Sequence, residues 1–296
     1  MTVGVVVMAY GTPSSPDEIE SYYTHIRLGR PPTAELLADL RSRYDAIGGV
    51  SPLRKITEAQ AARLQAALGD GYHVTLGLKH SSPFIEDAVP DDVDRVVGVV
   101  LAPHYSRGSV GEYLERLRET AASNGLEASG IESWCDLDEW VDFQAAAVRD
   151  ALAAMPERTT VLFTAHSLPE RVLEGDPYPE QLEASAKAIA QRARIERWQL
   201  AWQSSPRGAS APDPAAGRTA DAWQGPDILD VLPDLDADAV VVCPQGFTAD
   251  HLEVLYDLDI RAAERARELG LAFARTRSLN DDERVLTALA ERIRLQ

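Results

Sequence analysis

The residues most able to do chemistry lie in the stretch 240–260, which reads VVVCPQGFTADHLEVLYDLDI. An apolar, β-branched run gives way at Gly246 to a helix-like segment rich in acidic side chains, as in open α/β sheets that carry ligand sites. Glu253 and Asp257 are four residues apart, so a helix places both carboxylates on one face. Two such charges destabilise each other unless a proton or a metal ion accompanies them. The stretch therefore indicates proton or metal chemistry. The alternative is a solvated helix face.

Two other side chains that could do chemistry follow predicted strands. Tyr10 follows the apolar run Val3–Ala9, and His166 follows the run 159–164. Because the carboxyl ends of parallel strands share one edge of a sheet, such residues can converge. An imidazole with an ordinary pKa of about 6.5 can accept protons near neutrality, and with Glu253 it could bind a divalent cation. The alternatives are a structural histidine and a half-buried turn tyrosine.

A basic and aromatic patch occupies the polar region that follows the first strand. Its members are Arg27, Arg30, Arg43, Tyr22, Tyr23 and Tyr44. In an acidic protein such a patch could hold a flat ligand that carries carboxylates. The alternative is an ordinary solvated surface.

The elements that must position these residues alternate between strands and helices. Strands are predicted at 3–9, 73–78, 95–102, 131–134, 159–164, 198–202 and 240–242. Helices are predicted at 34–44, 57–68, 110–124, 139–155, 181–194 and 280–294. Thr57 with Gln60, and Asn280 with Glu283, are the expected caps of two of these helices. This order predicts an α/β protein with parallel sheets and crossover helices.

The strand–helix series begins again near residue 140. We therefore expect two similar α/β domains, 1–140 and 141–296, with the site in the cleft between them and a helix at the C-terminus. The segment 204–221 is rich in Pro, Ala, Gly and Ser, which predicts a surface loop.

Composition limits the classes of function. Of 296 residues, 45% are hydrophobic and 26% charged, as in ordinary globular proteins. The net charge of −18 argues against a nucleic-acid partner. Cys135 and Cys243 lack the spacing of disulfide frameworks, zinc knuckles or four-cysteine iron–sulfur clusters. No signal peptide is evident and no segment approaches the roughly 20 apolar residues of a membrane helix, so we expect a cytoplasmic protein without stable membrane insertion.

Several common active-site signatures are absent from the sequence. There is no GxGxxG after a strand, no P-loop, no GxSxG elbow and no HExxH. Nucleotide-dependent oxidoreductases, P-loop kinases and serine hydrolases are disfavoured accordingly.

A series of motifs resembles the ferrochelatases, in family order across almost the whole chain. The motifs are MAYGTP (8–13), YYTHIR (22–27), RYDAIGGVSPL (43–53), GLKHSSPFIEDAV (77–89), LAPHYS (101–106), TAHSLPE (164–170), GDPYPEQL (175–182), WQGPDI (223–228) and GFTADHLEVLYDLD (246–259). The resemblance is greatest to the Gram-positive branch that inserts ferrous iron into coproporphyrin III. It implies two Rossmann-like domains with the macrocycle in the cleft between them.

The resemblance also implies roles for particular residues. His166 and Glu253 would form the metal-insertion site, and Asp257 would lie on a proton or metal path. Tyr10 would be the axial ligand of the product iron. The implied porphyrin-binding residues are Tyr10, Arg27, Arg43, Tyr44, Ser51 and Tyr113.

The chain departs from the family pattern in three places. The segment 204–221 is longer than usual, and Arg261 stands where relatives continue the acidic row, which puts an accessory metal site there in doubt. With only two cysteines, no iron–sulfur cluster and no permanently bound cofactor are expected, and Fe²⁺ is a substrate. A monomer is expected. Alternatives are a protoporphyrin IX ferrochelatase, another metal chelatase, or a non-catalytic haem or porphyrin carrier.

Overall fold

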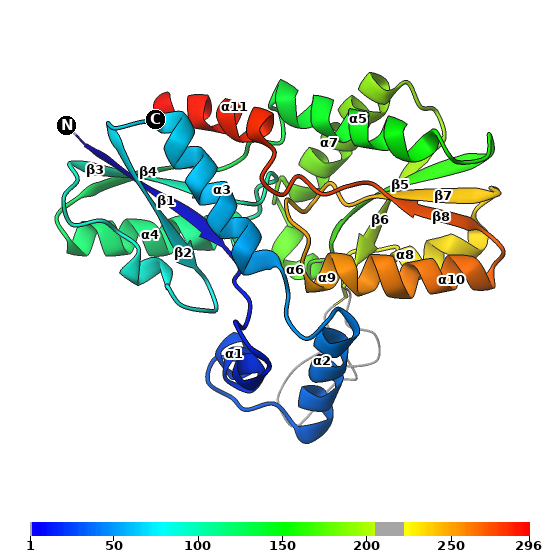
Figure 1. The fold of residues 1–296 in the computed structure, drawn as a ribbon, viewed down its shortest axis with the longest axis horizontal. Helices are drawn as coiled ribbons and strands as arrows, with labels where there is room; N and C mark the ends of the chain where they lie inside the picture. Colours follow the sequence, from blue (N-terminus) through cyan, green and yellow to red (C-terminus); the bar gives the residue numbers. More distant parts are fainter. Residues whose placement is uncertain (1, 205–221) are drawn as a thin grey trace.

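Two parallel sheets form the framework of the protein. The computed structural model describes residues 2–204 and 222–296 (Figure 1). The first four-stranded sheet has the order β2-β1-β3-β4, and the second has the order β6-β5-β7-β8. Every pair of neighbouring strands is parallel. The strands are β1 Val3–Ala9, β2 Tyr72–Leu78, β3 Arg95–Val100, β4 Glu127–Ile131, β5 Thr159–His166, β6 Trp198–Gln203, β7 Ala239–Cys243 and β8 Ala272–Arg275.

Helices cover both faces of each sheet. They are α1 Ile19–Ile26, α2 Ala34–Ala46, α3 Leu53–Leu68, α4 Glu112–Ser123, α5 Asp138–Leu152, α6 Glu170–Leu173, α7 Tyr178–Ala193, α8 Ile228–Val231, α9 Leu252–Leu255, α10 Ala263–Glu268 and α11 Glu283–Arg294, with π-helical segments at Arg107–Gly111 and Asp257–Ala262. Alternate residues of β1 enter different cores: Val5 packs with α3 and α11, and Val6 packs with α4. Burial on both faces explains why β1 is a continuous apolar run. Helices α1 and α2 project together from the rest of the fold (Figure 1).

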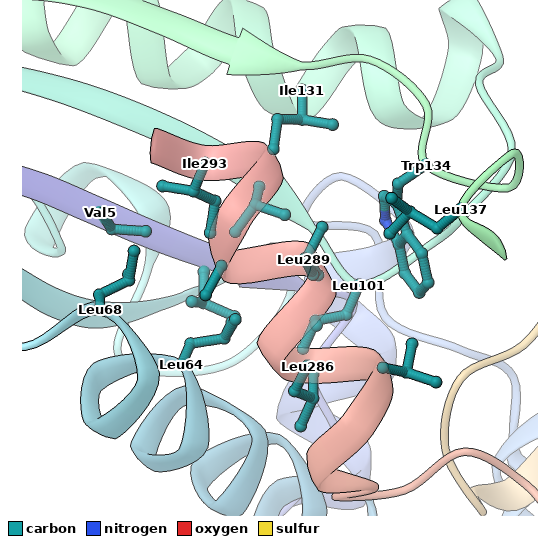
Figure 2. Close-up of a cluster of buried hydrophobic side chains, with 14 of the residues drawn as sticks. Val5, Leu64, Leu68, Leu101, Ile131, Trp134, Leu137, Leu286, Leu289 and Ile293 are labelled. Atoms are coloured by element: carbon teal, nitrogen blue, oxygen red, sulfur yellow. The ribbon is translucent and has the colours of Figure 1, made fainter. Parts of the chain in front are cut away.

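The last helix returns to the first sheet. Leu286, Leu289 and Ile293 of α11 pack in one core with Val5 and Leu64 (Figure 2). Helix α11 thereby closes a face of the sheet that contains the N-terminal strand.

Helix α5 belongs to both cores. Its Trp140 and Phe143 pack with the first sheet, while Val141 and Val148 pack with the second. The predicted domain boundary near residue 140 lies in the first turn of this helix, and the division at that point stays a prediction.

Hydrogen bonds also join the two halves of the chain. Thr248 Oγ1 donates to the carbonyl oxygen of Leu101 at 2.9 Å, and Gln60 Nε2 donates to that of Asn280 at 2.8 Å. The first bond lies beyond the end of β7, so it fixes the turn that leads to α9 against the first half.

The α/β class and the parallel sheets predicted from the sequence are confirmed, but the fourth strand was placed wrongly. Strand β4 ends at Ile131, where the prediction had begun it. A Cβ added at Gly130 would lie 2.4 Å from Leu114 Cδ2, so the strand needs a residue without a side chain there. The apolar pattern of the strand is weak because Glu127 and Ser129 are polar and Gly130 has no side chain. Trp134 lies in the following loop, and its indole donates to the carbonyl oxygen of Val100 at 3.0 Å.

Both predicted helix caps were wrong. Helix α3 begins at Leu53, and Thr57 lies inside it with its hydroxyl donating back to the Leu53 carbonyl. Helix α11 is capped by Asp282, whose side chain accepts from the backbone nitrogen of Val285 at 3.2 Å. Hydroxyl, amide and carboxylate side chains near a helix start offer several local hydrogen bonds, so spacing alone does not identify the capping residue.

Helix α1 and strand β8 were not predicted, because α1 lies within the polar stretch 14–32 and β8 has only four residues. Of the predicted loop 204–221, only Ser204 lies within the described residues.

Truncation of Leu289 to alanine tests the packing of α11. The side chain is fully buried, so we expect the free energy of unfolding to fall by about 2–5 kcal/mol, because a cavity forms in the first core. The matched control is Leu295→Ala, at a side chain that is 81% exposed next to the same helix, with an expected change below about 0.5 kcal/mol. Urea unfolding followed by circular dichroism measures both. Equal losses in the two variants would contradict the packing.

Candidate active site

His166 is the last residue of β5, at the carboxyl edge of the second sheet. Its Nδ1 contacts the carbonyl oxygen of Ser167. Since a carbonyl oxygen only accepts, Nδ1 carries the proton of this bond, and the other ring nitrogen is left for a different partner. That nitrogen, Nε2, lies 3.6 Å from Oε1 of Glu253.

Glu253 lies on the short helix α9, between two imidazoles. Its Oε2 is 3.9 Å from His251 Nε2, while Oε1 faces His166. The side chains of His166 and Glu253 are each 35% exposed, so a ligand can reach the pair from solvent.

The two groups shift each other's pKa. Burial acts to lower the pKa of His166, but the Glu253 carboxylate and the Ser167 carbonyl outweigh it and raise this pKa to about 9. Burial acts to raise the pKa of Glu253, but the imidazoles of His166 and His251 hold it well below its usual range. In the absence of a metal ion the pair is therefore an imidazolium and a carboxylate near neutral pH. A cation that binds the imidazole must displace its proton.

Asp257 places a second carboxylate behind Glu253. The segment between them is not one regular helix, because α9 ends at Leu255 and π-helical geometry begins at Asp257. Asp257 Oδ2 accepts from the Ser204 hydroxyl at 2.7 Å, and Oδ1 lies 3.5 Å from Arg261 Nη1. Burial raises the pKa of Asp257, the Ser204 hydroxyl opposes this, and the Glu253 carboxylate raises it further. The two carboxylates are close enough to interact, as the spacing predicted.

Tyr10 extends from the carboxyl end of β1 and is 44% exposed. Its ring contacts that of His80, with centroids 4.6 Å apart. Burial and then the Glu253 carboxylate raise the pKa of Tyr10, so the phenol and that carboxylate lie near each other although they belong to different sheets. The structure thus brings Tyr10 to the same region as His166 and Glu253.

Tyr44 and Arg43 approach the same region from α2. The buried Tyr44 hydroxyl lies 3.2 Å from Thr12 Oγ1, and burial raises its pKa to about 12 with a smaller contribution from Glu253. The Arg43 guanidinium lies 5.6 Å from the ring centre of Tyr256, which precedes Asp257. Its Nε is buried and has no hydrogen-bond partner among the residues that the structure describes.

Tyr113 is buried on α4 beside Tyr10. Burial and then Tyr10 raise its pKa, and the Lys79 ammonium group lies 5.3 Å from its ring centre.

Arg27 and Ser51 are not joined to this cluster. The Arg27 guanidinium lies over the ring of Tyr23 at 5.7 Å and donates to the carbonyl oxygen of Arg30. The Ser51 hydroxyl accepts from the backbone nitrogen of Leu53 at 3.3 Å and so serves the start of α3. Within the described part of the chain, no interaction links either residue to His166 or Glu253.

Three neighbours of the site were not singled out as site residues. His80 follows β2, and its Nδ1 lies 3.1 Å from that of His25. Its place at a strand end was a usable signal. His251 lies near the Glu253 carboxylate, on the side away from His166. Its place in the acidic stretch was its only signal in the sequence. Gln203 bonds the backbone of Glu253, and no sequence signal marked it.

The described residues contain no cluster of three or more His, Cys, Asp or Glu side chains arranged to hold a metal ion. Residues 2–204 and 222–296 also include no helix that is long and apolar enough to cross a membrane. The arrangement is thus a pair of possible metal ligands rather than a closed metal centre.

Sequence comparisons place this geometry in a known family. A family model described as Ferrochelatase matches residues 2–296. The chain is 44% identical to the coproporphyrin III ferrochelatase of Geobacillus kaustophilus, with 98% of this chain and 94% of that protein aligned. It is 42% identical to the coproporphyrin III ferrochelatase of Bacillus subtilis, with 97% and 96% aligned.

Comparisons of structure support the fold. The chain is similar to CbiX, described as the terminal enzyme of sirohaem biosynthesis in denitrifying bacteria, with a TM-score of 0.58, 15% identity, and 100% of this chain and 99% of that one covered. It is also similar to the sirohydrochlorin chelatase SirB of Bacillus subtilis subspecies spizizenii, with a TM-score of 0.55, 12% identity, and 99% and 94% covered. At these identities the likeness concerns the two-domain fold alone.

Replacement of Glu253 by glutamine tests the electrostatic pairing. Without the carboxylate, burial opposes the imidazolium, so we expect the pKa of His166 to fall by about two units or more. Asp257→Asn is the matched control, because Asp257 contributes less to this pKa than Glu253 does, and a smaller fall is expected. Nuclear magnetic resonance titration of the metal-free protein measures both values. An unchanged pKa in the Glu253→Gln variant would show that the two groups do not interact.

Proposed function

This chain belongs to the ferrochelatase family, and on that basis we propose that it inserts ferrous iron into coproporphyrin III during haem synthesis. The observation that carries the proposal is the imidazole of His166 facing the carboxylate of Glu253 at a solvent-accessible strand end. The names of the relatives supply the porphyrin, and the residues of the site supply the chemistry.

Insertion must remove water from Fe²⁺ and two protons from the pyrrole nitrogens. An imidazole suits proton acceptance, and a carboxylate with an imidazole suits a borderline cation such as Fe²⁺. In the proposed sequence, the arriving cation displaces the proton of the His166 imidazolium, and this proton leaves through Asp257 to water. As the cation moves to the macrocycle, the freed imidazole accepts the two pyrrole protons one after the other. Asp257 is placed to pass them on, because its raised pKa brings it closer to neutrality than an ordinary aspartate.

Two ligands suit a metal that must leave again. A resident structural metal is usually held by four protein ligands, and a catalytic one by three. His166 and Glu253 offer two ligands. The protein would therefore bind Fe²⁺ weakly enough to release it to the four porphyrin nitrogens. The metal is a substrate in this proposal.

The first half of the chain would hold the macrocycle. The exposed phenol of Tyr10 would ligate the product iron, and Tyr44 and Tyr113 would contact the ring. Arg43, whose guanidinium also pairs with Asp39 at 2.7 Å, would face a porphyrin carboxylate. Arg27 and Ser51 are included among the proposed porphyrin-binding residues only because of the resemblance to ferrochelatases. The proposal includes a monomeric enzyme.

The proposed substrate is tested with the purified protein under anaerobic conditions. We expect Fe²⁺ insertion into coproporphyrin III to be accelerated over a protein-free control, and insertion into protoporphyrin IX to be slower. Porphyrin absorbance follows both reactions. An equal or faster rate with protoporphyrin IX would contradict the proposed substrate, and no acceleration with either would contradict the proposed activity.

Substitutions at the pair test the assigned roles. His166→Ala and Glu253→Gln should each lower kcat by about 100-fold or more, since each removes a proton-transfer or metal-binding group. Porphyrin binding, measured by fluorescence quenching, should remain within about threefold. The control is His73→Ala, at an exposed histidine of β2 that has no place in the site. A near-normal kcat in either pair variant would remove that residue from the mechanism.

A further inference from the structure

We propose that Gln203 is a positioning residue that sets the place of Glu253 relative to His166. The inference deepens the proposed function and rests on it, because the pair that Gln203 positions is the one assigned to metal insertion. The Gln203 amide bonds the backbone of Glu253 and not the side chain of either residue, so its influence would pass through the backbone.

The side-chain amide of Gln203 joins β5 to the start of the acidic segment. Gln203 is the last residue of β6 and stands opposite His166 in the parallel ladder. Its Nε2 donates to the carbonyl oxygen of Glu253 at 3.1 Å, and its Oε1 accepts from the Thr164 hydroxyl at 2.9 Å. Both Thr164 and Gln203 are fully buried.

Both ends of the amide are in use, so its orientation is fixed. The Glu253 carbonyl requires a donor and the Thr164 hydroxyl donates, which leaves one arrangement of the amide nitrogen and oxygen. Thr164 lies on the same face of β5 as His166, because alternate residues of a strand share a face. The amide therefore fixes the distance between strand β5, which carries His166, and the backbone of Glu253.

Helix α9 is too short to hold Glu253 by itself. It spans four residues, and its N-cap residue His251 makes no side-chain capping bond. A four-residue helix has little internal hydrogen bonding, so its position depends on contacts with neighbouring elements. The bond from Gln203 supplies such a contact at the catalytic residue itself.

The turn before α9 rests on the same strand. Gly246 donates its backbone nitrogen to the carbonyl oxygen of Thr164 at 3.0 Å. A Cβ at Gly246 would lie 2.6 Å from Ala165 Cβ and 2.8 Å from Ala165 Cα. Thr164 thus anchors both ends of the segment: its carbonyl holds the turn at Gly246, and its hydroxyl orients the amide that holds Glu253.

Small displacements at such a site have large kinetic effects. A misplacement of about 1 Å can cost about 100-fold in rate. The hydrogen bonds of the Gln203 side chain go to Thr164 and Glu253 and to none of the proposed porphyrin-binding residues, so its loss should affect kcat rather than the KM for porphyrin.

The main test is Gln203→Met, which keeps the volume and removes both hydrogen bonds. We expect kcat to fall by about 10–100-fold with the porphyrin KM within about twofold. The matched control is Gln144→Met, at a buried glutamine of α5 that bonds Cys243 Sγ, with kcat expected within about twofold. If the control loses as much as Gln203→Met, the effect is general destabilisation and the proposal fails.

A double-mutant cycle asks whether Gln203 acts through Glu253. In a Glu253→Gln background, Gln203→Met should lower kcat by less than about twofold, because the side chain being positioned is already gone. An undiminished loss would overturn the proposal. Should Gln203→Met fail to fold, Thr164→Val removes the hydroxyl that orients the amide, and the same loss and the same cycle are expected of it.

A measurement without turnover separates this inference from the proposed function. In the metal-free protein, Gln203→Met should lower the pKa of His166 measured by nuclear magnetic resonance, because Glu253 moves away, and Gln144→Met should not. A lowered pKa would support the positioning role even if the wild-type protein inserted no iron. An unchanged pKa would overturn it even if insertion were confirmed.

Discussion

An imidazole and a carboxylate lie 3.6 Å apart at the end of the second sheet, and much of the structure serves to keep them there. His166 is fixed by a central strand, whereas Glu253 lies on a four-residue helix that follows a tight turn. The attraction between the two charges cannot by itself hold a flexible segment in one geometry. Buried contacts to β5 and β6, and a bond from the turn to Leu101 in the first half, supply the missing constraint.

The same contact explains how the site can serve a metal that passes through. The Glu253 carboxylate keeps the His166 imidazole protonated, and an arriving cation competes with that proton for the imidazole nitrogen. Asp257 is kept closer to neutrality by burial and by Glu253, so it can receive what the pair releases. Arg261 compensates its charge at 3.5 Å from the next turn. The acidic row of this chain thus ends at the partly exposed Arg261, the position at which the sequence departs from the family pattern.

The sequence predicted the features that depend on pattern and chemical type. Continuous apolar runs gave the parallel strands, and polar residues at the strand ends gave Tyr10, His166 and Glu253 as neighbours. Features that depend on individual contacts could not be predicted. Strand β4 has little apolar pattern because Glu127, Ser129 and Gly130 make up most of it, and the close fit of Leu114 against Gly130 is seen only in the structure. Gln203 carries no charge and belongs to no motif of known chemistry, so only its two buried hydrogen bonds reveal it. The return of α11 to the first sheet likewise depends on tertiary packing, since its apolar stripe does not specify which sheet it covers.

The central claim is that His166 and Glu253 act as one unit in metal insertion. The most direct test is the kcat of the His166→Ala/Glu253→Gln double variant, measured beside the two single variants with Fe²⁺ and coproporphyrin III. If the groups act together, the double variant should be no more than about threefold slower than the slower single variant, because the second substitution removes a partner that has already lost its role. A loss equal to the product of the two single losses would show that the groups act independently and would contradict the account.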